Sequence, residues 1–127
     1  INWFCREFQK VYTGIRIESN IDVQENNIPS SHNTVIYRII QEALNNIAKH
    51  SGADLVTLSL IEQANRVILD IRDDGVGFDV SKTLSMTPAR RGFGLASMSE
   101  RAGLSGADFK ITSEAGKGTT IRVEWDV

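Results

Sequence analysis

Three polar residues on one predicted helix could together do chemistry. At about 100° per residue, Glu42, Asn46 and Lys49 fall within an arc of roughly 60° that borders an apolar stripe. Carboxylate and amide oxygens are ligands that Mg²⁺ accepts, commonly one or two of them together with phosphates. The lysine ammonium is a point charge that suits a phosphate. The spacing therefore indicates a site for a metal ion and a phosphorylated ligand; the alternative is an ordinary solvated helix face.

A carboxylate at the end of a predicted strand could receive a flat ligand. The strand over residues 67–73 has an alternating apolar row, and the same period carries Asp73 inward and Asp74 to the opposite side. A carboxylate that continues a core-facing row needs a partner. Gly75 and Gly77 follow, and glycines let a flat ligand approach the backbone. The amino group of adenine would be a suitable donor; the alternative is a strand-end turn, in which Asp-Asp-Gly is common.

Two further signals lie later in the chain. Gly92 and Gly94 precede a predicted helix, where backbone N–H groups and the helix dipole favour an anion. Thr119 shares the alternation of the apolar row that ends at Trp125, so we expect its hydroxyl to point inward. The alternatives are a flexible joint before the helix and a threonine that bonds to neighbouring backbone.

The predicted elements could bring these residues together. Hydrophobic periodicity predicts helices over residues 2–12, 31–48 and 95–104, and strands over residues 15–23, 55–62, 67–73, 109–113 and 119–125. Residues 79–91 have no periodicity and are expected to form a loop. Runs of adjacent strands separated by helices predict an α+β fold, a two-layer α/β sandwich with a mixed β-sheet.

The composition is that of one globular domain. The chain has 127 residues, of which 41% are hydrophobic and 24% charged. A net charge of −2 offers no basic surface for nucleic acid. The single cysteine, Cys5, excludes an internal disulfide, and no apolar run approaches the roughly 18 residues of a membrane span. We therefore expect a cytoplasmic domain without direct membrane contact. Because the chain begins at Ile1 inside an amphipathic pattern, we expect a fragment of a larger protein.

The order of these motifs resembles the ATP-binding domain of sensor histidine kinases, in the superfamily shared with gyrase, heat-shock chaperones and MutL. Residues 41–51 look like the N box, residues 73–78 like the G1 box, residues 92–95 like the G2 box and residues 116–120 like the closing glycine-threonine turn. The resemblance runs from about Gly14 to the end of the chain. Residues 37–44 and 98–102 are similar to the nitrate-sensor-like branch of histidine kinases.

The resemblance implies a Bergerat-type fold, with helices on one face of the sheet, and ATP and Mg²⁺ as cofactors. Asn46 would bind Mg²⁺, and Glu42, Asn46 and Lys49 would be the catalytic candidates. Glu42 stands where many histidine kinases have an asparagine and gyrase-type ATPases a catalytic glutamate, so its role as supporting group, metal helper or base stays open. The implied nucleotide-binding residues are Asn46, Lys49, His50, Asp73, Gly75, Gly77, Phe78, Gly92, Gly94, Leu95 and Thr119.

The same resemblance implies a function in two-component signalling. Residues 14–127 would be the catalytic domain that supplies the γ-phosphate to a histidine on a separate dimerisation domain, and residues 1–13 a linker helix from that domain. Neither His32 nor His50 fits a phosphoacceptor. The expected partners are the dimerisation domain, a response regulator and a second copy of the full protein. The alternatives are an ATPase with Glu42 as general base, an anti-sigma-type serine kinase, and a degenerate module that binds a protein.

Overall fold

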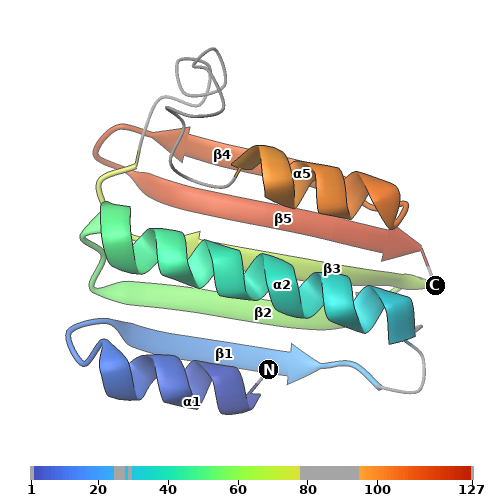
Figure 1. The fold of residues 1–127 in the computed structure, drawn as a ribbon, viewed down its shortest axis with the longest axis horizontal. Coiled ribbons are helices and arrows are strands. Elements are labelled where there is room, and N and C mark those ends of the chain that lie inside the picture. The colour runs from blue at the N-terminus through green and yellow to red at the C-terminus, as the bar shows by residue number, and fades with distance from the viewer. Residues whose placement is uncertain (1, 25–27, 29, 78–94, 127) are drawn as a thin grey trace.

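The computed structural model describes residues 2–24, 28, 30–77 and 95–126 (Figure 1). Its elements confirm the predicted helices and strands, with ends that differ by a few residues. In chain order they are α1 (Asn2–Val11), β1 (Arg16–Asp22), α2 (Ser30–Asn46), the π-helical turn η2 (Ile47–Ser51), β2 (Leu55–Gln63), β3 (Arg66–Asp73), α5 (Leu95–Leu104), β4 (Asp108–Glu114) and β5 (Gly118–Asp126).

The five strands form one mixed sheet in the order β1-β2-β3-β5-β4. β1 runs parallel to β2, while the β2–β3, β3–β5 and β4–β5 pairs are antiparallel. α1, α2 and α5 all lie on the same face of the sheet (Figure 1). A parallel pair needs a crossover, and here α2 supplies it between β1 and β2. The predicted α+β two-layer sandwich is confirmed.

The core lies between the helices and the sheet. The alternating rows of the central strands are buried on this side, and α2 covers them with an apolar stripe at helical spacing. The buried residues of α2 are Ile36, Ile39, Ile40, Ala43 and Leu44. The largest fully buried side chain is Trp125 of β5, whose Nε1 donates to Ser105 Oγ at 2.8 Å. This packing fixes α2 against the sheet, and so it fixes the position of every polar residue on α2.

The N-terminal helix is docked on the edge strand β1. Cys5 and Phe8 are buried, and burial raises the pKa of the Cys5 thiol. The Gln9 side chain donates to the carbonyl of Ile15 and accepts a hydrogen bond from the Ile17 backbone N–H at 2.9 Å. α1 therefore shares the core of the domain. Its assignment as a linker helix stays a prediction.

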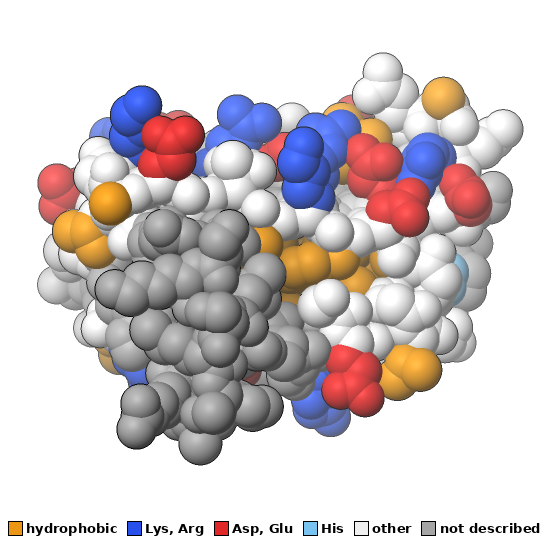
Figure 2. All heavy atoms as spheres, turned by 90° about the horizontal axis from the view of Figure 1, so that it is seen from above, with side chains coloured by type: hydrophobic (Ala, Val, Ile, Leu, Met, Phe, Trp, Pro, Cys, Tyr) orange, Lys and Arg blue, Asp and Glu red, His pale blue; other side chains and the backbone are white. Residues whose placement is uncertain are grey.

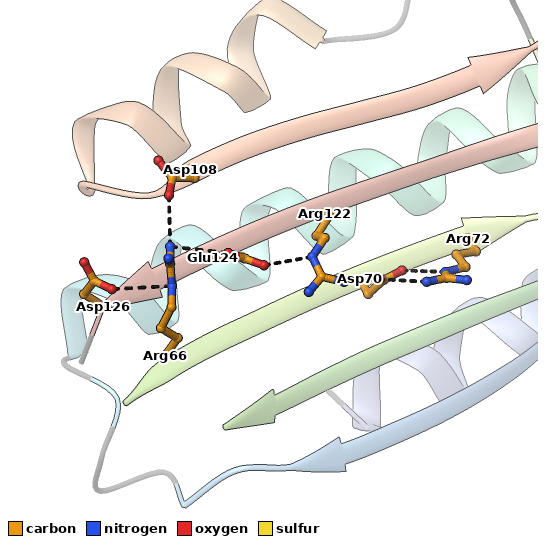
Figure 3. A network of polar contacts seen from close by, with 7 residues as sticks. All are labelled: Arg66, Asp70, Arg72, Asp108, Arg122, Glu124 and Asp126. Carbon is orange, nitrogen blue, oxygen red and sulfur yellow. Dashed lines mark hydrogen bonds and ion pairs between the residues drawn. The ribbon is translucent and has the colours of Figure 1, made fainter. Parts of the chain in front are cut away.

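The helix-free face of the sheet is covered by paired charges. Asp70, only 9% exposed, accepts hydrogen bonds from Arg72 at 2.9 Å and Arg122 at 3.3 Å. The full network, drawn in Figure 3, is Arg66, Asp70, Arg72, Asp108, Arg122, Glu124 and Asp126. Figure 2 shows acidic and basic side chains intermingled along this side of the molecule. Because most of these pairs are exposed to water, we expect each to add little stability.

Within residues 2–24, 28, 30–77 and 95–126, no helix is both long enough and apolar enough to cross a bilayer.

Candidate functional site

A polar row crosses three strands at one end of the sheet. Asp73 lies directly opposite Thr119, and Thr119 lies directly opposite Ser113. The preceding row contains Ile71 and Ile121, which are buried on the helix-covered side. Because side chains alternate along a strand, the polar row faces that same side. The C-terminal end of α2 lies at this end of the sheet (Figure 1), so the fold carries the helix candidates and the strand candidates to one end of the domain.

The Asp73 carboxylate is half-buried and held by backbone donors. Its Oδ1 accepts a hydrogen bond from the Gly75 N–H at 2.8 Å, and the backbone N–H of Thr119 also donates to the carboxylate. Burial raises the pKa of Asp73 and the charge of Asp74 adds to this rise, while the two backbone hydrogen bonds partly offset it. The orientation that strand parity predicted is observed. A carboxylate in this setting has acceptor capacity for a ligand that donates hydrogen bonds.

The neighbouring carboxylate has a different task. Asp74 Oδ1 accepts hydrogen bonds from the backbone N–H groups of Asp54 at 2.9 Å and Leu55 at 3.0 Å. Leu55 in turn accepts a hydrogen bond from the Asp74 N–H through its carbonyl, at 3.3 Å. The hydrogen bond from Leu55 is the main reason why the pKa of Asp74 is lowered. Asp54 and Leu55 come shortly after Gly52, the residue at which η2 ends, so Asp74 ties the end of β3 to the chain that leaves this helical segment.

We expect Asp74→Ala to lower the midpoint of urea unfolding, because two backbone N–H groups lose their acceptor. Asp74→Asn keeps one acceptor oxygen and should lose less. The pKa of Asp74 is depressed in the fold, so its contribution is present above the unfolded pKa and is lost as the pH falls through the folded pKa. Equal midpoints for the wild type and Asp74→Ala at neutral pH would contradict this role.

Two glycines let the turn between β4 and β5 pack against the segment that follows β3. Gly77 has φ +64°, and a Cβ there would overlap the carbonyl of Glu114. Gly118 has φ +83°, and a Cβ there would overlap the carbonyl of Asp73. The N–H of Gly116 donates to the carbonyl of Val76 at 2.5 Å. Close approach of protein backbone is thus a reason for both glycines, and at Gly77 it stands beside the approach of a flat ligand that was predicted for the glycines after Asp73.

Ser113 belongs to the same row, and sequence reasoning did not include it among the site residues. Its Oγ lies 2.8 Å from Oγ1 of Thr119 and donates to the carbonyl of Gly118 at 3.1 Å. The available signal was parity, because Ser113 continues the row of Phe109 and Ile111 in β4. That signal shows the direction of the side chain, but the contact with Thr119 depends on the register of the β4–β5 hairpin.

The helix side of the site differs from the α-helical geometry assumed for it. Glu42 and Asn46 are both half-buried and lie one α-helical turn apart, as predicted. The α-helix ends at Asn46, and Ile47–Ser51 form a π turn with i→i+5 hydrogen bonds. The predicted arc assumed α-helical spacing, which Glu42 and Asn46 have, whereas Lys49 lies in the π turn with its side chain exposed. A π turn widens the helix, and such turns are frequent at functional sites.

Some predicted site residues lie outside the described part of the chain. They are Phe78, Gly92 and Gly94, together with the side chains of His50 and Leu95. Among the residues that are described, no three His, Cys, Asp or Glu side chains cluster as a metal site. Asn46, the residue predicted to bind Mg²⁺, is an amide and does not enter such a cluster. An amide that works with phosphate oxygens fits Mg²⁺, since this ion often takes only one or two protein ligands.

Residues 31–127 match the protein family described as histidine kinase-, DNA gyrase B-, and HSP90-like ATPase. The oxygen sensor histidine kinase NreB of Staphylococcus carnosus is 33% identical over 121 residues, which are 95% of this chain and 33% of NreB. The sensor protein VraS of Staphylococcus haemolyticus is 37% identical over 103 residues, which are 81% of this chain and 28% of VraS. The chain thus spans a third or less of the length of these two relatives.

Solved structures show the same fold. The blue-light activated histidine kinase of Erythrobacter litoralis EL346 aligns with a TM-score of 0.80 and 17% identity over 98% of this chain and 40% of that protein. The catalytic domain of the histidine kinase ThkA aligns with a TM-score of 0.71 and 14% identity over 99% of this chain and 91% of that domain. With the family match over residues 31–127, these findings show that the chain belongs to the family of histidine kinase-, DNA gyrase B- and HSP90-like ATPases.

Proposed function

We propose that this chain is the ATP-binding catalytic domain of a sensor histidine kinase, which binds ATP with Mg²⁺ and supplies the γ-phosphate to a histidine on a separate dimerisation domain. The observation that carries the proposal is the pairing of the half-buried Asp73 carboxylate with Thr119 at the end of the sheet where the helix of Asn46 ends. The relatives named as a sensor histidine kinase and a sensor protein support it.

The candidate residues divide between those that would bind the adenine base and those that would bind the phosphates. Asp73 would accept a hydrogen bond from the adenine amino group, and Thr119 would support the base beside it. Asn46 would hold Mg²⁺, which when bound neutralises charge on the phosphates. Lys49 is exposed on the wide π turn, where its ammonium could reach a phosphate. Phosphoryl transfer asks the protein mainly to position groups and stabilise charge, and this residue set can do both.

The remaining expected residues complete the proposal. His50, Phe78, Gly92, Gly94 and Leu95 would line the phosphate side of the site. Gly75 is buried beside Asp73 and donates to its carboxylate, so it would support the base side. Glu42, half-buried one turn before Asn46, would support the metal site or act as a base.

The rest of the signalling protein enters the proposal through the reaction. Residues 1–13 would connect the domain to the histidine-containing dimerisation domain, and that domain would make the parent protein a homodimer and pass the phosphoryl group to a response regulator. Because ATP is the phosphoryl donor, such a domain would work in the cytoplasm.

A transfer assay tests the function. The chain is mixed with ATP labelled at the γ-phosphate, Mg²⁺ and the dimerisation domain of its parent protein. We expect label on the acceptor histidine, and its loss in Asn46→Ala or when Mg²⁺ is chelated, because the phosphates lose their charge partner. Thr57→Ala, which removes an exposed hydroxyl from the helix-free face, is the control and should transfer normally. Steady phosphate release that is lost in Glu42→Gln would instead identify a hydrolase. A complete lack of ATP binding would identify a degenerate module.

A further inference from the structure

The inference concerns the attachment of the N-terminal helix α1 to the edge of the sheet, and it rests on the proposed nucleotide site. β1 is the outermost strand on its side of the sheet, so in the described part of the chain one of its edges has no neighbouring strand. α1 lies beside β1 at this edge (Figure 1). The half-buried side chain of Gln9 joins the two elements, because its amide bonds to the backbone at the start of β1.

The Gln9 amide takes the place of a neighbouring strand. Its NH₂ group donates to the Ile15 carbonyl, and its oxygen accepts a hydrogen bond from the Ile17 N–H at 2.9 Å. The N–H between these two groups, that of Arg16, points the other way and donates to the Asp54 carbonyl at 2.8 Å. The N–H and C=O of a residue in a parallel strand would fill the same two positions. Gln9 therefore closes the start of the open edge and fixes α1 to it.

Hydrogen bonds continue from this contact to the strand end that carries the proposed adenine site. Asp54, which accepts from the Arg16 N–H, donates its own N–H to Asp74 Oδ1 at 2.9 Å. Asp74 also accepts the Leu55 N–H at 3.0 Å, and it follows Asp73 directly in the chain. The backbone that Gln9 holds and the carboxylate proposed to bind adenine thus lie on one path of hydrogen bonds.

We propose that Gln9 is a latch that couples α1 to the nucleotide site, so that bound nucleotide favours the state in which α1 is held on the sheet. A nucleotide that engages Asp73 orders the end of β3 and, through Asp74, the backbone that Gln9 holds. The coupling is reciprocal, because a ligand that stabilises the closed latch binds the open state more weakly by the same factor. Whatever pulls α1 from the sheet therefore weakens nucleotide binding, which makes α1 a regulatory element.

The buried thiol of Cys5 reports the latch in the whole chain, because Cys5 is the single cysteine and is buried in the face that α1 packs on the domain. The rate at which a thiol reagent labels it measures how often α1 opens. Without nucleotide, Gln9→Ala should be labelled about 10-fold faster than the wild type, the equivalent of two hydrogen bonds. Gln9→Glu keeps the acceptor for Ile17 but has no N–H for Ile15, so it should also be labelled faster. Lys10→Ala, at an exposed position of α1, is the matched control and should keep the wild-type rate.

The effect of nucleotide separates coupling from a purely structural role. Saturating ATP with Mg²⁺ should slow the labelling of the wild type by about 5-fold or more. Asp74→Ala interrupts the path, so ATP should leave its labelling rate nearly unchanged even though calorimetry still detects ATP binding. Rates are compared at low urea concentrations that do not change them, because local opening is insensitive to urea whereas global unfolding accelerates steeply.

Each outcome decides a different claim. Equal labelling of Gln9→Ala and the wild type would overturn the latch. Equal slowing by ATP in the wild type and Asp74→Ala would overturn the coupling, and so would a wild-type chain that binds ATP without slower labelling. A wild-type chain that binds no ATP in calorimetry overturns the proposed function and the coupling with it, while labelling without nucleotide still decides whether Gln9 holds α1.

Discussion

Asp73→Asn is expected to abolish measurable nucleotide binding while the domain remains folded. The Gly75 N–H and the Thr119 N–H already engage the carboxylate, so the substituted amide would turn its oxygen to them and its NH₂ toward the ligand. A donor would then face the adenine amino group, which is also a donor. Loss of a hydrogen bond to a charged group together with this mismatch should cost at least about 2.7 kcal/mol, a factor of about 100 in affinity.

Calorimetric titration with ATP and Mg²⁺ measures this effect, and thermal unfolding of the same sample reports the fold. The melting temperature should be kept or raised, because the substitution removes a charge that burial disfavours. Asp74→Asn is the matched control, since it makes the same chemical change one residue away on the opposite side of the strand and should leave ATP affinity nearly unchanged. Equal ATP affinity in Asp73→Asn and the wild type would refute the assignment of Asp73 as the residue that binds the adenine base.

The raised pKa of Asp73 gives this prediction a pH signature. Protonation turns one acceptor oxygen into a donor, so ATP affinity should fall with decreasing pH, starting at a higher pH than an unperturbed carboxylate would require. In Asp73→Asn that part of the pH dependence should vanish. The effect on stability has the opposite sign, because a folded state with a raised pKa takes up the proton more readily and gains stability as the pH falls through that pKa.

Gly118→Ala is expected to remove a large part of the stability of the domain. Gly118 has φ +83°, where an alanine is strained by about 1–2 kcal/mol. The added Cβ would also overlap the Asp73 carbonyl. Forcing extra atoms into a packed position lowers the stability by a further ~1–3 kcal/mol. Against a total stability of roughly 5–15 kcal/mol, a loss of about 2–5 kcal/mol should shift the unfolding curve far.

Gly116→Ala separates the two causes. Gly116 lies in the same turn with φ +82°, yet no atom of the described residues lies within 4 Å of the Cβ that an alanine would add. This variant should lose only the strain of the left-handed backbone, about 1–2 kcal/mol. Urea unfolding of both variants gives the difference, which measures how closely the β4–β5 turn packs on the strand that carries Asp73. If both variants lost the same stability, close packing at Gly118 would not be the cause.

The elements of the fold could be predicted because burial on one side leaves a period in the sequence. α2 buries one stripe and the central strands bury alternate residues, so periods near 3.6 and 2 mark them. The same periodicity predicted that Asp73 and Thr119 face the helices, and the structure places both in one row. The two hairpins, β2–β3 and β4–β5, were also predictable, since short connections join neighbouring antiparallel strands.

Three features of the site could not be predicted in this way. One is the change from α-helix to π turn after Asn46, which places Lys49 in a segment without α-helical spacing, and no periodicity marks so short a turn. Asp74 bonds to backbone groups that precede it by 19 and 20 residues. The third is the approach of the β4–β5 turn to Gly77. All but the first depend on which segments the fold brings side by side.

The polar row at the end of the sheet has one feature that the sequence predicts and one that depends on the whole fold. Alternation along each strand is enough to predict that Asp73, Thr119 and Ser113 point to the buried side, because it is a local property of the extended chain. The assembled sheet, in contrast, places β5 between β3 and β4 in this register, so that Thr119 lies opposite Asp73 on one side and Ser113 on the other. Strand order and register are set by packing of the whole core, and a single strand does not encode them.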